Sequence, residues 1–127
     1  MIFMDNDHAQ RWAAAIQTAG AVRDDDTVKG DFGASLYILT GLPSVYDRVE
    51  KHIHHGYIDF EPMLHMGLST GETILVALAG NLYNGSFFDR YDPLNIVSYC
   101  DTDGVVLATR ALLLRKRRCD INTIYDD

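Results

Sequence analysis

The chain has few cysteines and lacks any apolar run of membrane-spanning length. Only Cys100 and Cys119 occur in its 127 residues, and they do not form a C-x-x-C motif. We find no signal peptide, and no apolar run approaches the ~20 residues that a membrane-spanning helix needs. We therefore expect a cytoplasmic protein without a membrane partner. In that reducing environment its cysteines should be free, buried or half-buried thiols.

Recognisable catalytic motifs are also missing. The sequence contains no nucleophile elbow, no phosphate-binding loop and no complete set of metal ligands at a known spacing. It contains no internal repeat, low-complexity tract or interdomain linker, so residues 1–127 are expected to form one domain with a single core. These absences favour a non-enzymatic protein and give no reason to expect a cofactor.

Basic side chains are scarce over most of the chain. There are 18 Asp and Glu residues against 11 Lys and Arg residues, which gives a formal net charge of −7 at pH 7. Residues 1–109 hold 15 acidic and 6 basic side chains, whereas residues 110–127 hold 3 acidic and 5 basic ones. The acidic part should repel nucleic acid and attract a basic protein surface within a Debye length of about 8 Å. The same charge also serves solubility, which requires no partner.

The strongest local signal predicts a helix at about 70–84. Ser69 and Glu72 have the spacing of a capping box, and Gly85 stands where a C-terminal cap is expected. The apolar stripe between these caps comprises Ile74, Leu75, Leu78, Ala79, Leu82 and Tyr83. Because the stripe is wide, we expect this helix to be buried, with Leu78 pointing into the core.

Shorter patterns predict helices on both sides of this one. Asp7 with Gln10 and Ser44 with Asp47 have capping-box spacing and are assigned to the starts of the first and third helices. The six expected helices cover about residues 5–20, 32–40, 44–55, 70–84, 93–100 and 104–118.

Two segments have less decisive patterns. Residues 32–40 fit a buried strand as well as a helix, because a short apolar run has no clear period. Asp31 as a cap and Gly41 as a stop favour the helix. Residues 57–66 contain Pro62 and are expected to be irregular, with at most a short edge strand near 57–60.

Together these patterns predict an all-α, or nearly all-α, single domain. Five to six short helices are expected to pack around the helix at about 70–84. The polar tail at 119–127 is expected to be frayed.

Histidines and carboxylates form the first candidate site. On a helix over 44–55, His52 and His55 stand at i, i+3 on one face, and Asp59 or His65 could supply a third metal ligand. The pattern lacks the glutamate of an H-E-x-x-H motif. Imidazoles at the C-terminus of a helix also complement its dipole without a metal. A metal-binding protein or metal-dependent hydrolase is therefore an alternative interpretation.

A basic run near the end of the chain forms the second candidate site. It consists of Arg115, Lys116, Arg117 and Arg118. Clustered cations bind phosphates, so a small DNA-binding regulator is a further alternative. Cations in the last turn of a helix also complement its dipole. Because the rest of the chain is acidic, direct nucleic-acid binding is not expected.

Two loops are candidates for contact with a protein partner. The first loop holds Asp24, Asp25 and Asp26, which suit a basic partner and do not have the spacing of an EF-hand. The second loop is rich in aromatic residues, and its candidate contact residues are Phe87, Phe88 and Tyr91. Exposed loop aromatics are typical of binding hot spots, but such rings can equally complete the core.

Five sequence blocks resemble a known family. They are HAQRW at 8–12, LYILTG at 36–41, IDF at 58–60, LSTGE at 68–72 and AGNLYNG at 79–85. The pattern is similar to a family of small uncharacterised proteins, a domain of unknown function in Firmicutes and their phages and integrated elements. The resemblance spans about 3–117. It implies a compact, mainly helical intracellular domain in an accessory or mobile-element setting, and it supplies no catalytic residues.

The leading functional hypothesis is a non-enzymatic protein-binding module. It combines the acidic charge, the missing catalytic motifs and the family resemblance. In its specific form, the protein is an acidic inhibitor, encoded by a mobile element, that binds a basic nucleic-acid-processing defence enzyme of the host.

Overall fold

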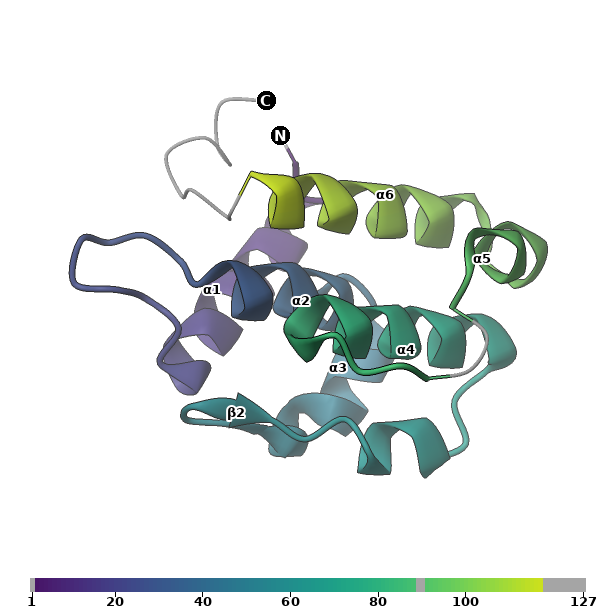
Figure 1. Ribbon diagram of the computed structural model, residues 1–127, viewed down its shortest axis with the longest axis horizontal. Helices are drawn as coiled ribbons and strands as arrows, with labels where there is room; N and C mark the ends of the chain where they lie inside the picture. The colour runs from purple at the N-terminus through teal and green to yellow at the C-terminus, as the bar shows by residue number, and fades with distance from the viewer. Residues whose placement is uncertain (1, 89–90, 118–127) are drawn as a thin grey trace.

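Helices dominate the computed structural model, which describes residues 2–88 and 91–117 (Figure 1). The six α-helices of these ranges are α1 (Asn6–Ala19), α2 (Gly30–Thr40), α3 (Pro43–Val49), α4 (Thr70–Asn84), α5 (Pro93–Tyr99) and α6 (Thr102–Lys116). The other elements are the 3-10 helices η1 (Glu50–His52) and η2 (Pro62–His65) and the strands β1 (Ile53–His54) and β2 (Tyr57–Ile58). The predicted fold class, a small helical domain with a short strand near 57–60, is confirmed. The tail at 119–127 lies outside the described residues.

The local signals of α4 act as the sequence predicts. Ser69 Oγ accepts a hydrogen bond from the Glu72 N–H at 3.2 Å, and Glu72 Oε1 accepts one from the Ser69 N–H at 2.9 Å. Gly85 ends the helix in the left-handed region at φ 77°. Every residue from 74 to 80 is buried, and Leu78 is 5% exposed. The prediction of a buried, capped helix is confirmed.

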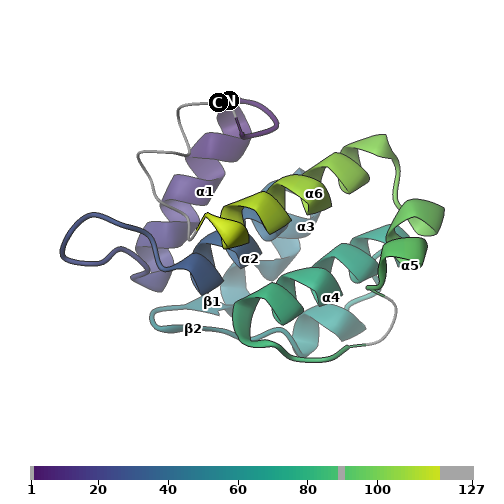
Figure 2. The ribbon, with the colours of Figure 1, turned by 45° about the horizontal axis from the view of Figure 1, so that its top comes forward.

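α2 lies at the centre of the bundle (Figure 2). It packs against α1, α3, α4 and α6, and all of its residues except Asp31 are buried. A helix covered on every side needs no polar face, which explains why its sequence reads as an unbroken apolar run. The alternative of a buried strand at 32–40 is wrong. α4 therefore shares the centre of the bundle with α2 (Figure 2).

α4 and α6 run parallel to each other, and α5 lies beside their N-terminal ends (Figure 1). At one end Cys100 Sγ donates to the Gly71 carbonyl at 3.6 Å, and at the other Arg115 Nε donates to the Leu82 carbonyl at 3.0 Å. Two neighbouring helices in the same direction require a connection that returns along their length, and the segment between α4 and α5 makes this return (Figure 1).

The starts of several helices differ from the sequence prediction. Asp5, not Asp7, caps α1, and its carboxylate accepts from the His8 N–H at 2.7 Å. α3 begins at Pro43 rather than at a Ser44 cap, because proline suits the first helical position and needs no N–H partner there. The cap of α6 is Asp101, which starts the helix at Thr102 instead of about 104.

The start of α2 differs as well. Its N-cap is Lys29, whose N–H donates to the Ala21 carbonyl at 2.9 Å. This bond lies beside the bridge between Val22 and Val28, and together they fix where the loop ends. Asp31 therefore lies in the first turn of the helix and is not its cap.

The predicted helix over 44–55 is wrong in its second half. α3 ends at Val49, and the chain passes through η1 into the antiparallel pair β1 and β2. Ile53 and Ile58 are opposite each other in the register, and both are buried. Gly56, at φ 91°, makes the turn, and its N–H donates to the Ala19 carbonyl at the end of α1. The spacing of Val49 and Ile53, which fits a helix, is thus also compatible with Ile53 lying in a hairpin.

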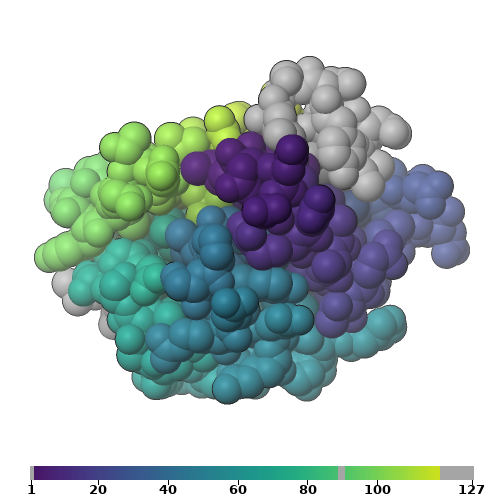
Figure 3. All heavy atoms as spheres, turned by 180° about the vertical axis from the view of Figure 1, so that it is seen from behind, coloured from purple at the N-terminus to yellow at the C-terminus, as the bar shows by residue number. Residues whose placement is uncertain are grey.

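Arginine side chains donate to backbone carbonyls instead of pairing with carboxylates. Within the described ranges, the one ion pair joins His65 to Glu61. The carbonyl acceptors are Thr40 for Arg11, Val28 for Arg23, Met66 for Arg48, Ile2 and Phe3 for Arg110, and Leu82 for Arg115. The Arg110 contacts hold the start of the chain beside α6, on the face that Figure 3 shows.

A buried histidine also anchors the start of the chain. His8 is 0% exposed; its Nδ1 accepts from the Met4 N–H at 3.1 Å, and its Nε2 donates to the Tyr37 carbonyl at 2.8 Å. Burial is the main reason why the pKa of His8 is lowered from its ordinary value to about 4. Because Nδ1 must be an acceptor, only the neutral ring fits this network.

The helices of the described residues were compared with the requirements for crossing a membrane. No helix there is both long enough and apolar enough to cross a bilayer.

We expect Leu78→Asp to lower the free energy of unfolding by several kcal/mol, because it places an unpaired charge in the core. The control Val97→Asp makes a similar change at a side chain that is 60% exposed, and it should change stability by about 0.5 kcal/mol or less. Urea denaturation measures both. Equal losses in the two variants would contradict the burial of Leu78.

We expect the stability of the protein to fall as the pH drops from about 6.5 to about 4. The unfolded chain takes up a proton at His8 more readily than the folded one, since the folded pKa is about 4. The loss should reach about 3 kcal/mol at the lower end of this window. Denaturation at a series of pH values tests it. His8→Gln should flatten the curve in this range, whereas the exposed control His65→Gln should leave its slope intact.

Candidate functional site

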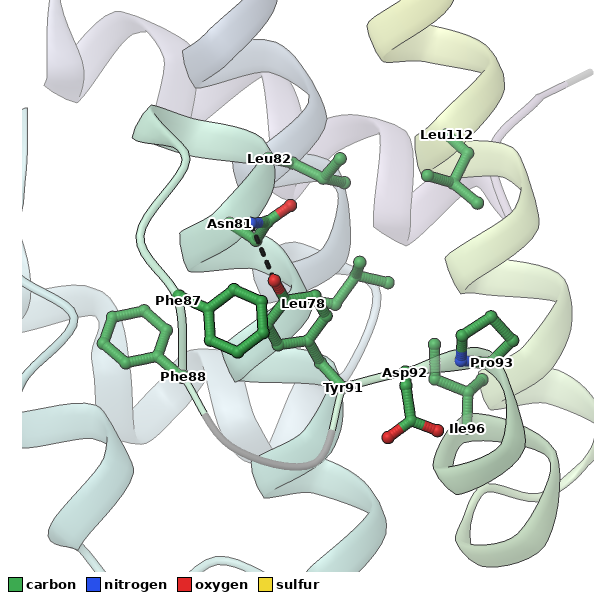
Figure 4. A pocket seen from close by; sticks show the side chains of 10 residues that line it. All are labelled: Leu78, Asn81, Leu82, Phe87, Phe88, Tyr91, Asp92, Pro93, Ile96 and Leu112. Carbon is green, nitrogen blue, oxygen red and sulfur yellow. Dashed lines mark hydrogen bonds between the residues drawn. The ribbon is translucent and has the colours of Figure 1, made fainter.

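An apolar groove of about 540 Å³ lies between α4, α5 and α6, and we call it the α4–α6 groove (Figure 4). Leu82 and Leu112 are at one end, Asp92 and Ile96 are at the other, and Leu78 lies between them. The other lining residues are Asn81 from α4, Phe87, Phe88 and Tyr91 from the loop after α4, and Pro93 from α5.

The loop after α4 is tied to the helix by one amide. Asn81 Nδ2 donates to the Tyr91 hydroxyl at 3.0 Å and to the Ser86 carbonyl at 3.2 Å. The ring of Phe88 lies over Gly80, where an added Cβ would be only 2.4 Å from its Cε2 atom. Gly80 therefore lets an aromatic ring pack directly on the helix backbone, and this contact shapes the loop side of the groove.

The rim of the groove exposes large apolar side chains. Phe87 is 86% exposed and meets the Tyr91 ring edge to face, with 5.5 Å between ring centroids. Leu112 is 51% exposed on α6, and Leu94 and Val97 are 73% and 60% exposed on α5. Apolar groups gathered around a concave surface are typical of a binding site.

Among the described residues that line the groove, Asp92 is the charged one. Its carboxylate caps α5 by accepting from the Asn95 N–H at 3.0 Å, and its bonds to Asn95 lower the pKa of Asp92. Asp101, the cap of α6, lines a separate pocket with Gly71 and Glu72. Arg115 donates to the Leu82 carbonyl and lines another pocket, with Asp31 and Tyr83.

The three aromatic candidates all lie at the groove, but they have different surroundings. Phe87 is exposed, whereas Phe88 and Tyr91 are half-buried. Sequence reasoning missed Leu112, although a signal was present in the three consecutive leucines of α6. Successive residues on a helix point in different directions, so Leu112, Leu113 and Leu114 cannot all face the core.

The acidic loop is separate from the groove. Asp24, Asp25 and Asp26 are exposed between α1 and α2, and none of them lines the groove (Figure 1). Asp25 accepts hydrogen bonds from the hydroxyl and the N–H of Thr27, which lower the pKa of its carboxyl group. The loop thus presents three carboxyl groups to solvent.

The histidine cluster does not assemble. His52 lies in η1, His55 lies in the hairpin turn against Gly20, and His65 pairs with Glu61 at 3.1 Å. The prediction that His52 and His55 share a helix face is wrong, because the helix ends before them. Asp59 directly follows β2, and its N–H donates to the His52 carbonyl at 3.0 Å. Among the described residues, no three His, Cys, Asp or Glu side chains could together hold a metal ion.

The basic run has a structural role at the end of α6. Arg115 donates to the Leu82 carbonyl, and Arg115 and Lys116 lie in the last turn, where cations complement the helix dipole. Arg117 follows as the C-cap residue. Arg118 lies outside the described residues.

Comparison of the chain with protein-family models, curated proteins and solved structures found no match. The resemblance to a phage and mobile-element family therefore stays a prediction.

We expect Tyr91→Phe to cost about 1 kcal/mol of stability, because Asn81 Nδ2 loses one of its two acceptors. The ring, and hence its contact with Phe87, is retained. Tyr57→Phe is the control. The Tyr57 side chain is 52% exposed, and the variant keeps the ring that stacks on His54. Urea denaturation should show a loss for the first variant alone, and an unchanged Tyr91→Phe protein would contradict the role of this hydrogen bond.

Proposed function

We propose that the protein is a non-enzymatic module that binds another protein through the α4–α6 groove. The observation that carries the proposal is an apolar groove whose rim exposes Phe87 and Leu112. Leaving such side chains in water forgoes hydrophobic stabilisation of roughly 25 cal/mol per Å² of apolar surface. A protein partner that covers the groove recovers this energy.

The polar groups of the groove support binding rather than chemistry. Asn81 is bonded to Tyr91 and Ser86, and Asp92 is engaged as the cap of α5. Each of these groups has a structural role that fixes the shape of the groove. A rigid, preformed surface lowers the entropic cost of binding a partner.

Charge supports a basic partner. The net charge is −7, and within the described ranges no carboxylate forms an ion pair with Lys or Arg. The exposed Asp24, Asp25 and Asp26 add a second acidic surface. Carboxylates that are not neutralised internally steer a basic protein toward this one. In its specific form, the proposal is an acidic inhibitor, encoded by a mobile element, of a host enzyme that processes nucleic acid.

We expect Leu112→Asp to weaken partner binding roughly 30-fold, the effect of losing a hot-spot side chain, without unfolding the protein. Leu112 is already 51% exposed, so the new carboxylate remains hydrated in the free protein. Immobilised wild type and variant would capture partners from a host lysate at low salt, and dissociation constants would then be measured with the purified partner.

Tyr57→Asp is the matched control, because Tyr57 is 52% exposed and lies in β2, outside the groove lining. It should bind like wild type. The proposal fails if no protein is captured or if Leu112→Asp captures as much as wild type. The inhibitor form requires more, namely that the captured enzyme acts on nucleic acid and loses activity when the protein is added.

A further inference from the structure

We infer that Asn84 is a site of spontaneous deamidation, at which the backbone nitrogen of Gly85 displaces the side-chain amide of Asn84 as ammonia. The inference concerns a covalent modification of this chain, and the reaction requires no partner. Three features support it, namely the absence of a side chain at Gly85, the exposure of Asn84, and the hydrogen bonds that the Asn84 side-chain oxygen accepts.

Asn84 and Gly85 form the exposed end of α4. Asn84 is the last residue of the helix, and Gly85 is its C-cap at φ 77°. A Cβ added at Gly85 would have no described heavy atom within 4 Å, so the surroundings of this residue are open. Because Gly85 has no side chain, nothing on it obstructs the approach of its nitrogen to the neighbouring amide carbon. The two groups are already tethered, which favours their reaction over a bimolecular one.

The side-chain oxygen of Asn84 is the atom on which negative charge develops during this attack. Asn84 Oδ1 accepts a hydrogen bond from the Ser86 N–H at 3.0 Å and another from the Ser86 hydroxyl. A backbone N–H can only donate, which identifies the acceptor as the amide oxygen. Two donors on one carbonyl oxygen polarise the C=O bond and stabilise the oxyanion of the tetrahedral intermediate. Ser86 therefore activates the amide of Asn84.

The reaction has two steps. In the first, the Gly85 nitrogen forms a bond to Asn84 Cγ while the bond between Cγ and Nδ2 breaks. The proton of the Gly85 N–H leaves with the amide nitrogen as ammonia, and a cyclic imide remains. In the second, a water molecule hydrolyses the imide at either of its carbonyl carbons. Opening at Cγ gives aspartate, and opening at the backbone carbonyl carbon gives isoaspartate, in which the main chain passes through the side chain.

A hydrogen bond of the helix restrains the first step. The Gly85 N–H donates to the Asn81 carbonyl at 2.8 Å, so the nitrogen must be released before it can attack. Helix ends open locally at a much lower free energy than the core of a protein does. We therefore expect a slow modification whose rate depends on opening of the last turn of α4.

The modification changes the loop side of the α4–α6 groove. The Ser86 carbonyl accepts from Asn81 Nδ2, which also donates to the hydroxyl of Tyr91 in the groove lining. Isoaspartate lengthens the main chain between α4 and Ser86 by a methylene group. Either product also places a carboxylate at the C-terminus of α4, where the helix dipole disfavours it. Weaker partner binding is the expected consequence, and this consequence alone rests on the proposed function.

Peptide mapping by mass spectrometry tests the inference. The purified full-length chain is incubated at neutral pH and physiological temperature and is sampled over several weeks. Asn84 should convert to a mixture of aspartate and isoaspartate, while Asn6, Asn81 and Asn95, which precede bulkier residues, should remain asparagine. Loss of Asn84 no faster than that of the other three would overturn the inference. Aspartate as the sole product would indicate direct hydrolysis by water and would overturn the attack by Gly85.

Variants test the roles of the two side chains. Asn84→Gln keeps an amide but requires a larger ring, so position 84 should stay unmodified over the same period. Ser86→Ala removes the hydroxyl donor and should slow the conversion of Asn84 roughly fivefold, the effect of one hydrogen bond. Ser98→Ala makes the same change on the exposed surface of α5 and should leave the rate unchanged. A Ser86→Ala protein that converts as fast as wild type would overturn the activating role of Ser86.

The outcomes separate this inference from the proposed function. The conversion of Asn84 is read from the mass of a peptide, so it is measured whether or not a partner exists. If Leu112→Asp retains the partner, the proposed function fails and the chemistry at Asn84 is unaffected. If Leu112→Asp loses the partner, aged wild-type protein should lose capture in proportion to its converted fraction. Full capture by the converted protein would overturn the expected effect on the groove.

Discussion

The structure depends on α2 being buried on every side. Ten of its eleven residues are buried, so it is stable only when other helices surround it. Close approach is possible because small groups lie at the contacts, as where Ser35 Oγ donates to the Ala79 carbonyl of α4 at 2.7 Å. The positions of α1, α4 and α6 follow from covering α2, and the groove lies between α4, α5 and α6.

Hydrogen bonds from arginine to carbonyl groups connect this core to the surface charge. Arg11, Arg110 and Arg115 join segments far apart in sequence by donating to main-chain oxygens. Cations used in this way do not neutralise carboxylates, so the acidic excess of the composition remains on the outside. At Arg115 the same bond joins the C-terminal ends of α4 and α6. Stability and surface polarity are therefore set by the same side chains.

Local signals predicted α4 well, because its caps and its periodicity agree. The capping box of Ser69 and Glu72, the stop at Gly85 and the burial of Leu78 are all present, because each depends on residues within a few positions of one another. The end of the third helix was predicted wrongly. Val49 and Ile53 fit a helical spacing, but Ile53 pairs with Ile58 in a hairpin whose turn is anchored on α1. That anchor is a tertiary contact and leaves no local signal.

The sequence by itself determined the helical class, the buried and capped α4, and the acidic charge, since composition and short-range spacing suffice for these. It also marked Phe87, Phe88 and Tyr91 as candidates without deciding which rings are exposed. Only the tertiary structure separated the histidines and brought Leu82, Leu112 and Asp92 around one groove. The physical reason is that the groove depends on the parallel packing of α4 and α6, which results from contacts between residues distant in the chain.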